Sequence, residues 1–88
     1  MDRQALKFLL VDALEEAKGE SIPHLAESQS LQEDLHLDSL DLVNLAVELQ
    51  YRLRVHANAE ELQSLATVGD LLAFLDVKVR NRVGSEAA

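Results

Sequence analysis

The sequence predicts an all-α fold: a small helical bundle of three main helices plus one short helix, with a long loop between the first and second helices. Two observations predict this class. Apolar residues recur at steps of three and four in separate stretches, which is the spacing of amphipathic helices. Nowhere do apolar and polar residues alternate as they do in a half-buried strand. Because the chain has only 88 residues, we expect one core.

The first helix is predicted over residues 3–18, because Gly19 follows at the position of a C-cap. The loop over residues 20–33 contains Pro23 and several serines and has no sustained period. Loops of this length are usually functional or disordered, and spaced apolar residues favour an ordered loop here. The predicted apolar face comprises Leu6, Leu9, Leu10, Ala13, Leu14 and Ala17, and Leu25 and Leu31 are expected to anchor the loop in the core.

The second helix is predicted over residues 39–53, with Asp38 as its N-cap and Asp41 as the acidic partner in a capping box. Its residues divide into two groups when they are placed at 100° intervals. The helix is therefore expected to have a core side and a side open to partners. Its apolar arc contains Leu42, Val43, Leu45, Ala46, Val47, Leu49 and Leu53, and its polar stripe contains Asp41, Asn44, Glu48 and Arg52.

Two further helices complete the predicted bundle. A short one begins after Asn58, and Thr67 and Asp70 cap the start of the last one. We expect a single helical domain over residues 1–83, and a disordered tail over residues 84–88, which has little to bury. The apolar face of the last helix is expected to contain Val68, Leu71, Leu72, Leu75 and Val79.

Charge and composition exclude several classes of function. The chain has 8 Lys+Arg against 16 Asp+Glu, a formal net charge of -8, and no cysteine. Binding to nucleic acid needs clustered basic residues, so we expect none, and a basic protein partner fits the charge better. No apolar run approaches the roughly 18 residues of a membrane span, and the first residues lack a signal-peptide pattern. We therefore expect a cytoplasmic monomer with no membrane contact.

The sequence does not predict an enzyme or a metal site. Although His36 lies three residues before Ser39, no Gly-x-Ser-x-Gly elbow surrounds this serine. His24, His36 and His56 lack the spacing of a helical zinc pair and have no cysteine to support them. Asp34 and Asp38 flank Leu-His-Leu without the glycine and spaced oxygens of a calcium loop.

The segment from Leu31 to Val43 resembles the attachment region of acyl carrier proteins of the free-standing type. In that family an apolar loop anchor precedes Asp-Leu, two variable residues, and then Asp-Ser-Leu at the start of the second helix. The similarity continues through the short turn at Glu60 and Glu61 and the Thr-Val-x-Asp-Leu start of the last helix. The family positions are occupied here by Leu31, Asp34, Leu35, Asp38, Ser39 and Leu40.

This resemblance implies that Ser39, preceded by Asp38, carries 4'-phosphopantetheine through a phosphodiester. The terminal thiol of that group would hold acyl intermediates as thioesters in fatty-acid, polyketide or related secondary metabolism. The implied partners are a phosphopantetheinyl transferase and acyl-transferring and acyl-modifying enzymes with basic patches. The implied partner surface contains the acidic residues Asp38, Asp41 and Glu48 and the apolar residues Leu40 and Val47.

Some positions depart from the fatty-acid type of carrier. Asn44 stands where that type often has Glu, and Gln50, Arg52 and Arg54 stand where it is commonly acidic. These departures favour a specialised carrier. Two alternatives remain open: a peptidyl or aminoacyl carrier, and an unmodified acidic interaction module in which Asp38 and Ser39 only cap a helix.

Overall fold

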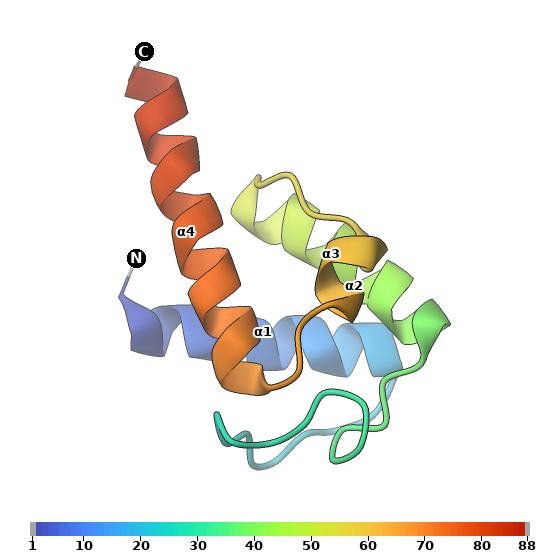
Figure 1. Ribbon diagram of the computed structural model, residues 1–88. Coiled ribbons are helices and arrows are strands. Elements are labelled where there is room, and N and C mark those ends of the chain that lie inside the picture. Colours follow the sequence, from blue (N-terminus) through green and yellow to red (C-terminus); the bar gives the residue numbers. More distant parts are fainter. Residues whose placement is uncertain (1, 88) are drawn as a thin grey trace.

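Four helices form the chain in the computed structural model, which describes residues 2–87, and their side chains as far as Asn81. They are α1 (Arg3–Lys18), α2 (Ser39–Leu53), the short α3 (Ala59–Gln63) and α4 (Val68–Ala87). α1 packs against α2 and against α4, and α3 packs against α2; the C-terminal end of α4 extends past the other helices (Figure 1). The predicted all-α class is confirmed, including the short third helix.

Capping residues define the ends of the first two helices, as the sequence predicts. Gly19 ends α1 with a left-handed φ of 73°, and its N–H donates to the Glu15 carbonyl at 2.8 Å. Such a φ favours glycine because it lacks a Cβ. Asp38 caps α2 within a complete capping box, in which Asp41 is the other member.

The core consists of aliphatic side chains, mostly leucine. Among the side chains that the structure describes, no polar or charged residue is buried. An aliphatic interior needs no internal hydrogen-bond partners, so its stability comes from apolar area removed from water. Buried residues of α1 and α4 meet those of α2 in one cluster; from the helices it contains Leu6, Leu10, Ala13, Leu14, Leu42, Leu45, Ala46, Leu49, Leu53, Leu62, Val68, Leu71, Leu72, Leu75 and Val79.

The long loop between α1 and α2 is ordered and tied to the start of α4. Leu25 and Leu31 are buried, which confirms them as anchors. The Gly69 N–H donates to the Glu27 carbonyl at 2.9 Å, and the Leu31 N–H donates to the Ala66 carbonyl at 2.9 Å. An isolated β-bridge between Ser30 and Thr67 accompanies these bonds. Backbone groups of this loop thereby find hydrogen-bond partners in the first turn of α4 and in the residues just before it.

The apolar face of α2 is narrower than its sequence pattern predicts. Leu42, Leu45 and Leu49 are buried, but Val43 and Val47, which the periodicity places on the apolar arc, are exposed. α1 and α3 cover only part of the helix, so two residues at the edges of the arc lie outside the contact. α2 therefore presents apolar side chains outward.

The last two helices begin with reciprocal caps. The Asn58 side chain accepts from the Glu61 N–H at 2.9 Å, and Thr67 Oγ1 accepts from the Asp70 N–H at 3.1 Å. α4 then continues as helix through Ala87, so no break follows Val83. The division into a domain over residues 1–83 and a disordered tail over 84–88 stays a prediction, and Ala88 lies outside the described residues.

Candidate functional site

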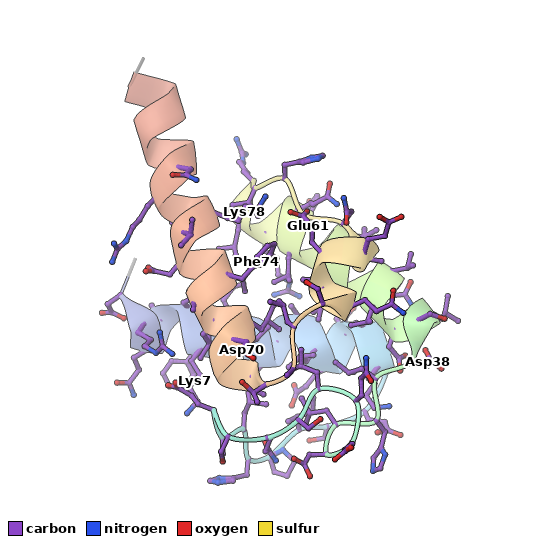
Figure 2. The ribbon with its side chains drawn as sticks, in the orientation of Figure 1. Lys7, Asp38, Glu61, Asp70, Phe74 and Lys78 are labelled. Carbon is purple, nitrogen blue, oxygen red and sulfur yellow. The ribbon has the colours of Figure 1, made fainter. Side chains whose placement is uncertain are left out.

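Ser39 is the first residue of α2 and its side chain is exposed. Asp38, labelled in Figure 2, lies at the outer edge of the molecule at this end of the helix. Asp38 Oδ1 accepts from the Asp41 N–H at 2.8 Å, and Asp41 Oδ2 accepts from the Asp38 N–H at 3.1 Å. Each of the two aspartates therefore accepts a hydrogen bond from the backbone N–H of the other.

This arrangement leaves the Ser39 hydroxyl available for chemistry. In the described part of the chain no hydrogen bond engages that hydroxyl, because Asp38 performs the capping that a serine often performs. The N-terminus of a helix also carries a partial positive charge and unpaired N–H groups, which favour an anion such as a phosphodiester. An exposed hydroxyl at this position fits a phosphorylated prosthetic group.

The segment before Ser39 is held by alternate anchors. Leu35 and Leu37 are buried, while His36 between them is exposed and has a left-handed φ of 55°. The Leu37 N–H donates to the Leu31 carbonyl at 3.0 Å. With Leu37 fixed in the core, Asp38 and Ser39 necessarily emerge at the surface.

Asp41 is not a free charge on the outer stripe of α2, and the sequence expectation that it lies there needs correction. Its carboxylate turns back to the Asp38 N–H, and its Oδ2 lies 3.6 Å from the Nζ of Lys18. Each of these two side chains is only 17% exposed. Lys18 comes from the end of α1, so no local pattern in the sequence marked this contact.

The outer face of α2 carries a row of exposed apolar side chains beside Glu48, which is paired with Arg52. Leu40 and Val47, two of the predicted partner contacts, are 66% and 59% exposed. Tyr51 is 85% exposed and Val43 is also exposed; neither is among the partner contacts expected from the sequence. Their spacing from Leu40 and Val47, at three- and four-residue steps, is the signal that would have found them.

Ionic contacts elsewhere on the surface involve two glutamates. A hydrogen bond from Lys78 lowers the pKa of Glu61, whose Oε2 lies 3.3 Å from the Lys78 Nζ. Lys78 and Glu61 lie between α4 and α3, together with Phe74 (Figure 2). A hydrogen bond from Arg3 lowers the pKa of Glu27. Both contacts join segments distant in the sequence.

Over the described residues, no group of His, Cys, Asp and Glu side chains is arranged to hold a metal ion. Within the same range no helix combines the length and the apolar character needed to cross a membrane. The site is thus built from a serine hydroxyl, a helix N-terminus and its caps.

A four-helix fold with an exposed serine at the start of its second helix defines a phosphopantetheine-dependent carrier domain, and comparison supports this class. The family described as "Phosphopantetheine attachment site" matches residues 5–75. An acyl carrier protein of Saccharopolyspora erythraea is 32% identical over 88 residues, covering 99% of this chain and 93% of the relative. The chain belongs to the acyl carrier protein family, whose members carry acyl groups on phosphopantetheine in fatty-acid or related biosynthesis and are not enzymes.

Other comparisons agree in sequence and in fold. An acyl carrier protein of an Exiguobacterium species is 25% identical over 79 residues, covering 90% of this chain and all (100%) of the relative. The solution NMR structure of holo acyl carrier protein from Geobacter metallireducens superposes with a TM-score of 0.73 at 26% identity, covering 90% of each chain.

Proposed function

We propose that Ser39 is the residue to which phosphopantetheine is attached. The observation that supports it is the exposed Ser39 hydroxyl, left free because Asp38 and Asp41 cap α2 with their own side chains. When bound, the group supplies the thiol on which an acyl group is held. The chain has no cysteine, so it offers no competing thiol.

The residues around Ser39 have distinct tasks in this proposal. The N-terminus of α2 offers its N–H groups and partial positive charge to the phosphodiester. Asp38 orients the first turn through its bond with the Asp41 N–H. Leu37, buried below, holds the attachment point at the surface so that the arm extends into solvent.

We propose that partner enzymes bind the outer face of α2. Leu40 and Val47 offer exposed apolar contacts, and Asp38 and Glu48 offer negative charge to a basic patch. Asp41 contributes to this surface mainly by shaping the first turn, because its carboxylate is engaged in the cap and with Lys18. The partners are a phosphopantetheinyl transferase and enzymes that transfer or modify acyl groups. We propose that the protein acts in the cytoplasm.

We also propose a specialised acyl pathway in place of general fatty-acid elongation. Arg54 caps the C-terminal end of α2, and Arg52 within its last turn is paired with Glu48 at 3.0 Å, so this end of the helix has no excess of negative charge. A partner shaped for a uniformly acidic helix would place its own cations there without a counter-charge. The test is the rate at which fatty-acid elongation enzymes extend the acyl group carried by the wild type and by the double variant Arg52→Glu with Arg54→Asp. If fatty-acid enzymes elongate the double variant no faster than the wild type, the two arginines do not determine selectivity.

The test of attachment is intact-mass analysis of the chain expressed with a broad phosphopantetheinyl transferase. We expect the wild type to gain the mass of the group, Ser39→Ala to stay at its unmodified mass, and the exposed loop variant Ser28→Ala to load as the wild type does. Circular dichroism should show the same helix content in all three. A wild type that stays unmodified, or a loaded Ser39→Ala, would overturn the proposal; the first result would favour an unmodified interaction module.

A further inference from the structure

Lys18 lies where three parts of the attachment region meet: the end of α1, the loop before Ser39 and the first turn of α2. Its Nζ lies 3.6 Å from Asp41 Oδ2 and donates to the His36 carbonyl at 3.3 Å. These contacts fall on the two sides of Ser39 in the chain. We propose that Lys18 is a positioning residue that holds Ser39 in the geometry required by the transferase, an inference that rests on the proposed attachment at Ser39.

The first contact fixes the capping carboxylate. Asp41 Oδ2 accepts from the Asp38 N–H at 3.1 Å, and the same oxygen faces the Lys18 ammonium. A carboxylate bound by both a backbone N–H and a cation has fewer orientations available than one bound by the N–H alone. Lys18 thereby limits the motion of the capping box formed by Asp38 and Asp41, the residues on either side of Ser39 and Leu40.

The second contact holds a strained backbone. His36 has φ 55°, a left-handed conformation that is uncommon for a residue with a Cβ. The N–H groups of its neighbours, Leu35 and Leu37, donate to the Ser30 carbonyl at 3.1 Å and the Leu31 carbonyl at 3.0 Å. The His36 carbonyl then points to Lys18. The loop is therefore fixed up to the residue before Asp38.

Lys18 and Asp41 are largely shielded from solvent, which strengthens their interaction. The Lys18 and Asp41 side chains are each 17% exposed, so their interaction is screened less by salt than that of fully exposed pairs. Lys18 is also the last residue of α1, where a cation interacts favourably with the helix dipole. In addition, Glu15 Oε2 accepts from the Ile22 N–H at 2.8 Å, which fixes the start of the loop that follows α1.

The sign of the charge separates this role from electrostatic steering. Removal of Lys18 makes an already acidic chain more negative, which by steering alone would speed its encounter with a basic transferase. Loss of positioning has the opposite effect on turnover. The two mechanisms therefore predict opposite changes for the same variant.

The experiment measures transfer of phosphopantetheine to the unmodified full-length chain, with kcat and KM determined separately. The variants are Lys18→Met, which removes the ammonium, and Lys18→Arg, which retains a cation. The matched control is Lys78→Met, because Lys78 forms a comparable ion pair, 3.3 Å from Glu61, on a part of the molecule remote from Asp38, the residue before Ser39 (Figure 2). The free energy of unfolding and amide exchange at residues 39–41 are measured for each variant.

For Lys18→Met we expect kcat/KM to fall about fivefold, equivalent to ~1 kcal/mol, mostly in kcat. Amide exchange at residues 39–41 should rise, whereas Lys18→Arg and Lys78→Met should transfer at close to the wild-type rate. Equal rates for Lys18→Met and Lys78→Met, or a fall confined to KM, would overturn the inference. If Lys18→Met does not fold, Lys18→Gln replaces it, since its amide can still donate but carries no charge. A wild type not loaded on Ser39 would instead overturn the proposed attachment.

Discussion

Arg52 donates from its Nε to Glu48 Oε1 at 3.0 Å, one turn earlier on α2. Its Nη1 also lies 3.8 Å from Asp12 Oδ2, which belongs to α1. The negative charge of Glu48 on the outer face of α2 is therefore partly neutralised by Arg52 of the same helix. At the N-terminal end of α2, Asp41 is paired with Lys18, whereas no described ion pair involves Asp38, so the Asp38 carboxylate next to Ser39 keeps its negative charge uncompensated.

Reversal of charge at Glu48 should weaken steering by partners. In Glu48→Lys the new ammonium lies beside Arg52 and presents positive charge to a basic partner, so transfer should slow several-fold at low salt. The loss should shrink as salt rises, because exposed charges are screened beyond about 8 Å at physiological ionic strength. The measurement is kcat/KM for loading at two salt concentrations, with Glu16→Lys on α1 as the control. Equal losses at both would indicate a steric cause.

Removal of the Asp38 carboxylate should destabilise α2 from its first turn. Asp38→Ala loses the acceptor for the Asp41 N–H and should lower the free energy of unfolding by ~1 kcal/mol. Asp38→Asn keeps an oxygen acceptor and should cost less, and Ser39→Ala should cost no more than about 0.5 kcal/mol. Urea denaturation of the three variants gives the order. If Ser39→Ala proved the most costly, the assignment of the cap to Asp38 would be wrong.

The loop anchor Leu31 should be as important to stability as a helix residue of the core. Leu31 is buried, and Leu31→Ala should lower the free energy of unfolding by about 2–5 kcal/mol. Exposed Leu40 provides the control, since Leu40→Ala should change it by less than about 0.5 kcal/mol. Thermal denaturation of both variants makes the comparison. Similar midpoints would show that the loop does not pack as the structure has it.

Stability should depend on acid pH through Glu61. Its pKa is lowered in the folded chain by the hydrogen bond from Lys78, so the folded state favours the carboxylate. The contribution of Glu61 to the free energy of unfolding is therefore fully present above its pKa in the unfolded chain, about 4.3. It is lost as pH falls through the lower pKa of Glu61 in the folded chain. Glu61→Gln keeps an acceptor for the Asn58 N–H but not the charge. The difference in unfolding free energy between wild type and Glu61→Gln should be largest near neutral pH and vanish in acid; a constant difference would refute the linkage.

Local rules were sufficient wherever the structure depends on neighbours in the chain. The caps at Asp38, Asn58 and Thr67 and the glycine end of α1 were predicted from residues within one helical turn. Hydrogen bonds between groups three or four residues apart form whenever the helix forms. The exposure of Leu40 follows instead from the resemblance to acyl carrier proteins, which implies this residue as a partner contact.

The sequence by itself determined the helices, their caps, the two loop anchors and the acidic start of α2, because each follows from short-range geometry and apolar spacing. Only the tertiary structure decided how far the covered side of α2 extends, since Val43 and Val47 fit an apolar arc that the neighbouring helices leave partly uncovered. It also decided that Lys18 meets Asp41 and the His36 carbonyl. Those contacts depend on how α1 packs against α2, which is a property of the assembled core and not of any single segment.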